Sequence, residues 1–286
     1  MNRLTPPRPV QYLDVLRAAL AEDLGTAGDL TTDAIVDPSA TAEGALVARQ
    51  PGRVAGLDVA AAVFALVDHA VTVTPLVADG DDVAAGSALG TVRGPARAIL
   101  TGERVALNVL GRLCGIATAT AALVAAVGDH PARITATRKT TPGLRALERY
   151  AVRAGGGADH RFGLDDGVLI KDNHLAVAGG VAPAVARARD RAGHMVRIEV
   201  EIDTLEQLHE ALALGVDAVL LDNLGPAALA EAVRRVNGRA TTEASGGITA
   251  DTVAAVAASG VDLISVGWLT HGAPALDVGL DVTPTG

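Results

Sequence analysis

Lysine is nearly absent from this sequence. Two of its 24 Lys and Arg residues are lysine, Lys139 and Lys171, and each follows a short β-like run. An ammonium group is a compact point charge, whereas a guanidinium group is a flat fork. Either the two lysines survive by chance in a composition that disfavours them, or they serve chemistry that needs a point charge. Binding phosphate and forming a Schiff base are two such uses.

Aromatic residues and cysteine are also scarce. Aromatic residues make up 2% of the chain although 49% of it is hydrophobic, so the core has to be built from Ala, Val, Leu and Ile. Such a core suits tightly packed α/β layers. The one cysteine, Cys114, lies in the apolar run Leu113–Ala117 and cannot form an intrachain disulfide. We expect a buried structural thiol and a reducing, cytoplasmic location.

Long apolar segments and basic clusters are missing as well. The first residues lead into no apolar signal segment. The longest apolar stretch, Leu113–Val127, is interrupted by Gly115, Thr118 and Thr120 and falls short of the roughly 18–20 residues that span a bilayer. The formal net charge is −9, and no Lys/Arg-rich run is interleaved with aromatics. We therefore expect a soluble protein that binds neither membrane nor nucleic acid, although a cleft that concentrates cations can still bind anions.

The first hundred residues and the rest of the chain differ in pattern. The first part combines helical periodicity at Val10–Leu24 and Leu57–Val67 with turn-rich, alternating segments, which predicts an α+β domain. From about Gly102 a long helix is followed by alternating strands and helices. The predicted strands are Ile134–Thr137, Val168–Ile170, Ile198–Ile202, Ala218–Leu221, Thr241–Ala244 and Leu263–Val266. The predicted later helices are Thr204–Leu214, Ala227–Val236 and Ala250–Ser259. This alternation predicts a parallel sheet, either closed as a barrel or open and doubly wound.

Polar or small residues end the predicted strands. They are Arg138, Lys139, Lys171, Asp172, Glu201, Asp222, Asn223, Ser245, Gly246, Gly247 and Gly267. The carboxyl ends of successive parallel strands in a (β/α) barrel converge on one mouth, where such barrels keep their active sites. The distribution therefore indicates an enzyme or an anion-binding barrel.

The segment Ser245-Gly246-Gly247 precedes a predicted helix start near Asp251. Small residues let backbone N–H groups approach a phosphate, and a helix N-terminus adds a favourable dipole. Gly267, after the last strand, is a candidate to complete such a cradle. The alternative is a plain βα turn, which also favours glycine.

Glu201 and Asp222 lie 21 residues apart, about one βα unit, so we expect them on adjacent strand ends. Paired carboxylates in a basic cleft can hold Mg²⁺, bind sugar hydroxyls or stabilise a developing oxocarbenium ion. The alternative is that they only neutralise Lys139 and Lys171. The seven histidines are scattered and show no zinc-ligand spacing.

The most specific motifs lie between Thr137 and His174. They are Thr137-Arg-Lys-Thr-Thr-Pro-Gly-Leu-Arg145, Glu148-Arg-Tyr-Ala-Val-Arg-Ala-Gly-Gly-Gly157, His160-Arg-Phe-Gly-Leu164 and Leu169-Ile-Lys-Asp-Asn-His174. Further motifs are Glu22-Asp-Leu-Gly25, Gly28-Asp-Leu-Thr-Thr32, Gly102-Glu-Arg-Val-Ala-Leu-Asn108, Glu199-Val-Glu201, Leu221-Asp-Asn223, Glu243-Ala-Ser-Gly-Gly-Ile248 and Ser265-Val-Gly267. Over nearly the whole chain, these closely resemble the quinolinate phosphoribosyltransferases, also called carboxylating nicotinate-nucleotide pyrophosphorylases.

The resemblance implies a fold and an activity. The implied α/β fold has an N-terminal α+β sandwich domain, at residues 1–110, followed by an incomplete, roughly seven-stranded TIM-like (β/α) barrel at residues 111–274. Residues 275–286 are a candidate to return to the first domain. The implied enzyme is a pentosyltransferase that couples quinolinate to phosphoribosyl pyrophosphate with loss of CO₂. Its products are nicotinate mononucleotide and pyrophosphate, in de novo NAD biosynthesis.

The resemblance also assigns roles to residues. Lys139, Lys171, Glu201 and Asp222 are implied to be catalytic, with Mg²⁺ held directly or through water by Glu201 and Asp222. The wider substrate-binding set comprises these four with Arg104, Thr137, Arg138, His160, Arg161, Ser245, Gly246, Gly247, Val266 and Gly267. Within this set, the resemblance assigns binding of the dicarboxylate quinolinate to Arg104, Arg138, His160 and Arg161. Arg104 is implied to enter the neighbouring subunit's site, so we expect a homodimer.

Alternatives to individual roles and to the whole interpretation stay open. Arg104 can instead pair with Glu103, and His160 or Arg161 can brace the residues that touch the ligand. Asp159 and Trp268 depart from the family pattern, in which Asn and a small residue are usual. One alternative function is that of a Schiff-base lyase that uses Lys171. The other is a non-catalytic accessory paralogue of the kind associated with molybdenum transport, which would bind a ligand without turnover.

Overall fold

The computed structural model of this chain describes residues 4–285. It forms two compact units. One comprises Met1–Ala121, Thr140–Gly156 and Leu269–Gly286, and the other comprises Ala122–Lys139 and Gly157–Trp268. Neither unit is one continuous stretch of chain, and the domain boundaries expected from the sequence stay a prediction.

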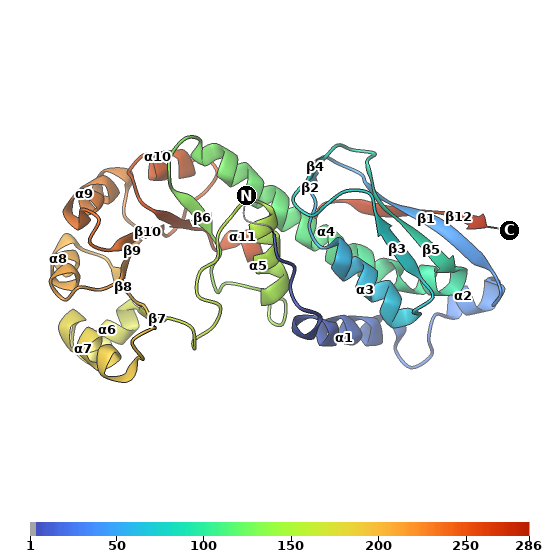
Figure 1. The fold of residues 1–286 in the computed structure, drawn as a ribbon, viewed down its shortest axis with the longest axis horizontal. Coiled ribbons are helices and arrows are strands. Elements are labelled where there is room, and N and C mark those ends of the chain that lie inside the picture. Colours follow the sequence, from blue (N-terminus) through green and yellow to red (C-terminus); the bar gives the residue numbers. More distant parts are fainter. Residues whose placement is uncertain (1–3, 286) are drawn as a thin grey trace. The chain divides into compact units, whose positions relative to one another are not determined.

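The first unit is built on a four-stranded antiparallel sheet (Figure 1). Its strands, in spatial order, are β12 (Val278–Thr285), β1 (Thr41–Ala48), β5 (Ala88–Pro95) and β3 (Thr72–Pro75). The short strands β2 (Gly52–Arg53) and β4 (Asp82–Val83) pair separately. The helical elements are η1 (Pro9–Gln11), α1 (Leu13–Leu24), α2 (Leu30–Ile35), α3 (Leu57–Val67), α4 (Ala96–Val127), α5 (Arg145–Ala154) and α11 (Trp268–His271). The prediction for α3 is confirmed residue for residue, and α1 begins three residues later than predicted.

Helix α4 runs for 32 residues and is long and apolar enough to cross a membrane by length and composition alone. Half of its apolar window is buried inside the protein, and one such helix is weak evidence for a membrane span. Close packing explains the burial, because a Cβ at Gly115 would lie 2.0 Å from the carbonyl oxygen of Pro274. Cys114, also on α4, is fully buried, which raises the pKa of its thiol to about 12. The prediction of a buried structural cysteine is confirmed.

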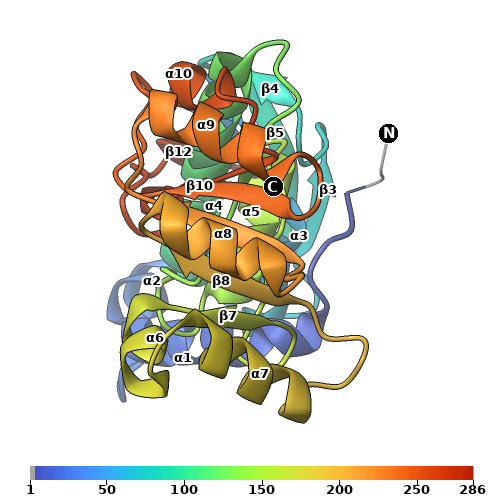
Figure 2. The same cartoon turned by 90° about the vertical axis from the view of Figure 1, so that its left-hand side faces the viewer.

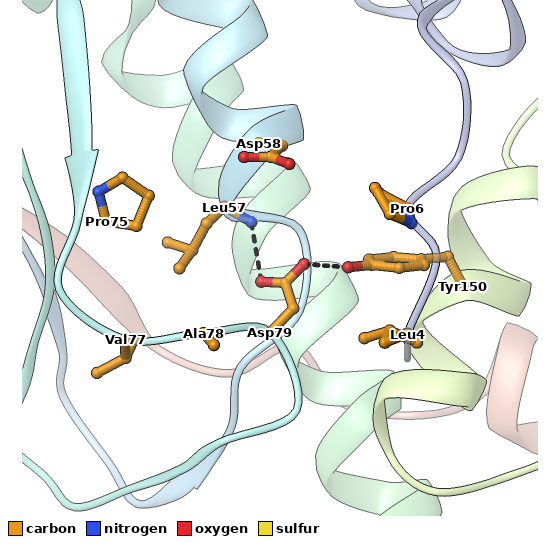
Figure 3. Close-up of a pocket in the computed structure, with 9 residues that line it drawn as sticks. All are labelled: Leu4, Pro6, Leu57, Asp58, Pro75, Val77, Ala78, Asp79 and Tyr150. Atoms are coloured by element: carbon orange, nitrogen blue, oxygen red, sulfur yellow. Dashed lines mark hydrogen bonds between the residues drawn. The ribbon is translucent and has the colours of Figure 1, made fainter. Parts of the chain in front are cut away.

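A cavity of about 340 Å³ lies beside the N-terminus of α3 (Figure 3). Asp79 accepts hydrogen bonds from the amides of Gly56 and Leu57, which satisfies donors at the start of the helix. It also accepts one from the hydroxyl of Tyr150 at 2.6 Å. None of the predicted site residues lines this cavity.

A buried ion pair holds three segments of the first unit together. Glu148 on α5 is fully buried and lies 2.8 Å from Arg112 on α4. Arg112 also donates to the carbonyl oxygens of Thr270 and Ala273, and Glu148 accepts the amide of Thr141 at 2.9 Å. Breaking such a pair leaves an uncompensated buried charge.

The second unit is a six-stranded parallel sheet (Figure 2). The spatial order is β6 (Arg133–Thr135), β11 (Leu263–Ser265), β10 (Thr241–Ser245), β9 (Ala218–Asp222), β8 (Ile198–Ile202) and β7 (Val168–Ile170). Its helices are α6 (Asp172–Ala178), α7 (Val181–Arg191), α8 (Leu205–Ala213), α9 (Pro226–Val236) and α10 (Val253–Ala257), and both views show them on one face of the sheet (Figures 1 and 2). Every predicted strand is present, and the predicted incomplete TIM-like barrel is confirmed.

Two details differ from the expectations. The described barrel has six strands rather than roughly seven, because only Ala158 of the next segment pairs with β6, as an isolated bridge to Thr135. The predicted helix Ala250–Ser259 was also too long, since α10 begins at Val253. The turn that leads into α10 starts at Thr249, whose carbonyl accepts the amide of Val253 at 3.0 Å and whose own amide donates to the hydroxyl of Thr252 at 2.9 Å, as at the start of a helix. The predicted phosphate cradle stays a prediction.

We predict that Glu148→Gln lowers the free energy of unfolding by about 3 kcal/mol, because Arg112 would lose its buried counter-charge. Urea denaturation measures the change. Asp14→Asn is the matched control, since Asp14 pairs with Arg17 at the same 2.8 Å but in solvent, and we expect it to cost less than about 1 kcal/mol. Equal losses in the two variants would contradict the assignment of Glu148 as a structural hub.

Candidate active site

Cations and carboxylates of the second unit lie where its parallel strands end. Lys139 follows β6, Lys171 follows β7, Glu201 is near the end of β8, and Asp222 ends β9. All six strands run in the same direction, so these ends share one edge of the sheet. Lys139, Lys171, Glu201 and Asp222 are therefore at one end of the barrel and not on separate faces.

Lys171 and Glu201 form the central pair of opposite charges. The Lys171 ammonium lies 3.7 Å from Oε2 of Glu201, with the lysine side chain half exposed and the glutamate side chain 10% exposed. Burial is the main cause that raises the pKa of Glu201, and the neighbouring Asp222 charge adds to it, while Lys171 acts in the opposite direction. Oε2 of Glu201 is buried and accepts no hydrogen bond from the described residues.

A third carboxylate joins Glu201 and Asp222. One oxygen each from Glu201, Asp203 and Asp222 lies within 4.8 Å of the others. The sequence analysis paired Glu201 with Asp222 but missed Asp203. The signal was present, because side chains two residues apart in an extended segment point the same way, and Asp203 lies two residues beyond Glu201.

Lys139 lies across the end of β11. A Cβ at Gly267 would lie 2.7 Å from Cδ of Lys139, so the glycine makes room for the lysine side chain. The amide of Lys139 donates to the hydroxyl of Thr137 at 3.0 Å, which orders the turn after β6. Val266 is buried and its amide donates to the carbonyl of Thr135, so Val266 supports Gly267 without offering its own N–H to a ligand.

The turn after β10 is formed by two consecutive glycines with positive φ, Gly246 at +97° and Gly247 at +56°. The side chain of Asn223 lies against Gly246, because a Cβ there would be 2.1 Å from its Oδ1. Trp268 donates from its indole nitrogen to the carbonyl of Ile248 at 3.0 Å. Trp268, a departure from the family pattern, thus supports the segment that follows the glycine turn.

A guanidinium patch lies on the loop between β6 and β7. Arg161 donates to the carbonyl of Gly167 at 3.0 Å, while its Nε is buried and has no partner among the described residues. Burial lowers the pKa of Arg161, and so does the positive charge of the neighbouring Arg138. Two cations that repel each other in this way form a patch suited to an anion. Asp159, the second departure from the family pattern, is exposed beside this patch.

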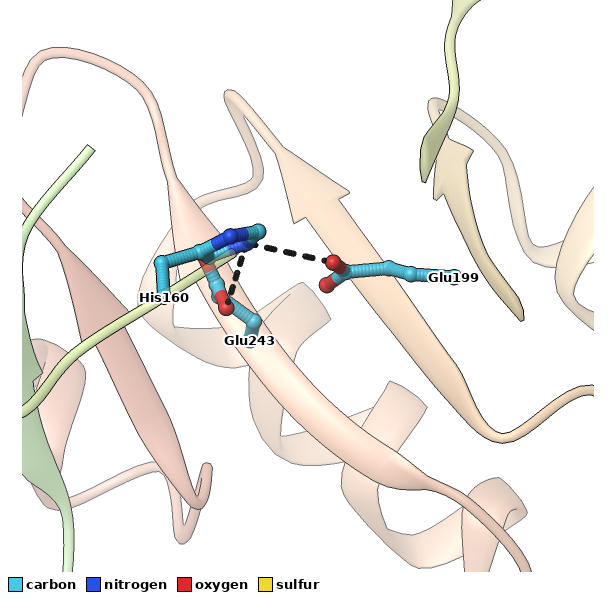
Figure 4. A group of neighbouring side chains, drawn as sticks. All are labelled: His160, Glu199 and Glu243. Carbon is cyan, nitrogen blue, oxygen red and sulfur yellow. Dashed lines mark ion pairs between the residues drawn. The ribbon is translucent and has the colours of Figure 1, made fainter. Parts of the chain in front are cut away.

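His160 points into a cluster that the sequence analysis did not predict (Figure 4). Its Nε2 lies 3.2 Å from Glu199 and 3.5 Å from Glu243. Both acids lie on central strands, β8 and β10, where hydrophobic residues are the rule. Acidic residues within strands that are expected to be buried could have predicted this cluster. The sequence analysis assigned no role to Glu199 or Glu243.

Arg104 belongs to the first unit and is exposed on α4. Within residues 4–285 it forms no salt bridge, so the alternative pairing with Glu103 is not present.

Comparison with known proteins identifies relatives of the chain. The family profiles "Quinolinate phosphoribosyl transferase, N-terminal domain" and "C-terminal domain" match residues 29–114 and 116–281. The probable nicotinate-nucleotide pyrophosphorylase (carboxylating) of Bacillus subtilis is 46% identical over 96% of this chain and 94% of its own length. Quinolinate phosphoribosyltransferase (decarboxylating) 1b of Nicotiana tabacum is 40% identical over 97% and 84%. The solved structure of NadC from Streptococcus pyogenes superposes with a TM-score of 0.94 at 42% identity and covers 99% of this chain and 100% of that one.

An open parallel (β/α) barrel with ammonium, guanidinium and carboxylate groups at its strand ends is the arrangement of an enzyme that acts on anionic substrates. Both family profiles match in consecutive order, and the relatives align over nearly the full chain. The chain belongs to the quinolinate phosphoribosyltransferase family.

We predict that Gly246→Ala lowers the free energy of unfolding by about 3 kcal/mol, from positive-φ strain and overlap with Asn223. Urea denaturation gives the value. Gly247→Ala is the control, since its φ is also positive but nothing lies within 4 Å of its Cβ, and we expect it to cost about 1 kcal/mol. If both variants lose the same amount, Asn223 does not constrain the turn.

Proposed function

We infer that this protein transfers the phosphoribosyl group of phosphoribosyl pyrophosphate to quinolinate with decarboxylation. The products are nicotinate mononucleotide, pyrophosphate and CO₂, in de novo NAD biosynthesis. The observation that carries this inference is full-length membership of the family together with its charged groups at one end of the barrel. The names of the two relatives given above describe this activity.

The two substrates call for different cations. Quinolinate is a flat dicarboxylate, and guanidinium groups bind carboxylates as bidentate forks, so we assign it to Arg138 and Arg161. Pyrophosphate is assigned to Lys139 and Lys171, whose ammonium groups act as point charges. The backbone of Ser245–Gly247 and Gly267 completes this phosphate side. His160 already uses both ring nitrogens within the protein, which favours the interpretation that it braces Arg161.

The reaction needs charge stabilisation and positioning more than acid–base chemistry. As pyrophosphate leaves toward Lys139 and Lys171, positive charge develops at C1′ and faces Glu201 and Asp222. The pyridine nitrogen then attacks C1′ and becomes cationic. That positive charge stabilises the electron pair left on the adjacent ring carbon when CO₂ departs, and the carbon then takes up a proton.

The residues present suit a magnesium ion. Mg²⁺ prefers oxygen ligands, and the described cluster supplies carboxylate oxygens from Glu201, Asp203 and Asp222 within 4.8 Å of one another. The buried Oε2 of Glu201, which accepts no hydrogen bond from the described residues, is a further reason to place a cation there. These three residues would hold the ion directly or through water, and the ion would neutralise charge on the pyrophosphate.

The Schiff-base alternative is less well supported. A lysine nucleophile is activated by an apolar pocket or by another cation beside it. Lys171 is instead half exposed and 3.7 Å from the carboxylate of Glu201. The cytoplasmic location expected from the sequence stays a prediction.

We predict that Lys139→Ala and Glu201→Ala each lower kcat/KM by about a hundredfold or more, because each removes a charge that stabilises the transition state. The measurement is release of CO₂ from carboxyl-labelled quinolinate, dependent on phosphoribosyl pyrophosphate. Glu206→Ala, an exposed acid on α8 of the same unit, should keep wild-type activity. Turnover of nicotinate without turnover of quinolinate would move the enzyme to a sister class.

We further propose a homodimer in which the exposed Arg104 reaches the partner's quinolinate site. Mixing inactive Arg104→Ala and Lys171→Ala subunits then restores one intact site in each heterodimer, or about a quarter of all sites after random reassociation. The experiment mixes the two variants under mild dissociation and measures kcat per subunit. Activity that stays at the level of the separate variants would show that Arg104 does not act across an interface.

A further inference from the structure

The imidazole of His160 has both nitrogens engaged inside the protein. Nδ1 accepts the backbone N–H of Arg161 at 2.7 Å. Nε2 lies 3.2 Å from Glu199 and 3.5 Å from Glu243, so it carries the ring proton and directs it at the two acids (Figure 4). The ring therefore connects the loop that bears Arg161 to two central strands of the barrel.

The two acids lie close together around one imidazole. Oxygens of Glu199 and Glu243 lie within 4.8 Å of each other, and one imidazole proton faces both. Each acid also has a buried oxygen with no hydrogen-bond partner among the described residues, Oε1 in both cases. Two acids in one buried site need hydrogen-bond donors, and among the described residues the imidazole of His160 faces both of them.

Glu243 is the more deeply buried of the two acids. Its side chain is 3% exposed, against 12% for that of Glu199, so charge is more costly there. Burial and the charge of Glu199 raise the pKa of Glu243 to about 7, while His160 and a hydrogen bond from Ser265 act in the opposite direction. For His160, burial lowers the pKa, but the hydrogen bond to Glu199 and the charges of both acids raise it overall. A second ring proton would have to displace the Arg161 amide from Nδ1, so the geometry retains the neutral ring.

We propose that Glu199 and Glu243 are positioning residues for the transferase reaction, which act through His160 to place Arg161 against a carboxylate of quinolinate. This rests on the proposed function. Glu199 provides the nearer contact to Nε2 of the ring, at 3.2 Å, and Glu243 provides the second contact, at 3.5 Å. Neither acid touches the substrate. Their effect falls on the dicarboxylate, because the amide that His160 accepts belongs to Arg161, which is assigned to quinolinate.

The test compares two isosteric variants, Glu199→Gln and Glu243→Gln. Glu199→Gln places an amide at the nearer of the two contacts of the imidazole and should raise KM for quinolinate by about tenfold or more, about the free energy of one hydrogen bond that orients the ring. Glu243→Gln mimics a protonated carboxyl and should leave that KM within about threefold of wild type. In both variants KM for phosphoribosyl pyrophosphate should stay within about twofold.

A readout without turnover separates this proposal from the proposed function. In ¹⁵N-labelled wild type, the His160 imidazole should show the neutral form protonated at Nε2, and Glu199→Gln should alter that pattern while Glu243→Gln preserves it. Wild type without activity would overturn the proposed function and leave the imidazole result standing.

Three results would overturn the positioning role itself. The first is equal KM values for quinolinate in Glu199→Gln and wild type, and the second is an equal rise in KM for both substrates. The third is a stoichiometric metal ion in the purified protein that Glu199→Gln loses, since His160, Glu199 and Glu243 would then be its ligands. A lower melting temperature with unchanged KM values would assign the two acids to stability alone.

Discussion

The common direction of the six parallel strands is the constraint on which the second unit depends. Because the strands run the same way, their carboxyl ends meet at one edge, and Lys139 packs on Gly267 although 128 residues separate them. Register is equally restrictive. A slip of β8 by one residue would turn Glu201 to the opposite face and leave Ile202 in its place. Strand direction and register together turn charges dispersed along the chain into one site.

Burial then separates some of these charges. Glu201 and Glu243 are buried and Arg138, Lys139 and Lys171 are exposed, while Asp203 is also exposed and Arg161 is partly buried. A buried carboxylate is held in place by its surroundings, whereas an exposed ammonium on a flexible stem can follow a ligand. This division matches the proposed reaction, in which positive charge develops at a fixed carbon while the pyrophosphate moves away. It also explains how a chain with a net charge of −9 attracts anions, because the cations form the outer layer of the site.

The sequence predicted the strands of the barrel well, since continuous β-branched runs are typical of buried parallel strands. It located the groups that follow strand ends, such as Lys139 and Asp222, because the end of an apolar run is visible in the sequence. It did not predict which groups touch. The carboxamide of Asn223 against Gly246 and the imidazole of His160 between two acids depend on neighbours that are brought together only by the sheet. Helix ends are the least precise part of a prediction from sequence, and α10 begins three residues after the predicted Ala250.

The use of lysine instead of arginine at position 171 has a physical explanation in its contact with Glu201. A guanidinium at position 171 would tend to form a forked, bidentate pair with that carboxylate and occupy both of its oxygens. The ammonium of Lys171 instead stays 3.7 Å away, and Oε2 of Glu201 keeps its capacity to accept a hydrogen bond. At position 139 the methylene stem passes over a glycine that has no room even for a Cβ. Position 171 therefore favours lysine, whose ammonium neutralises Glu201 without occupying both of its oxygens.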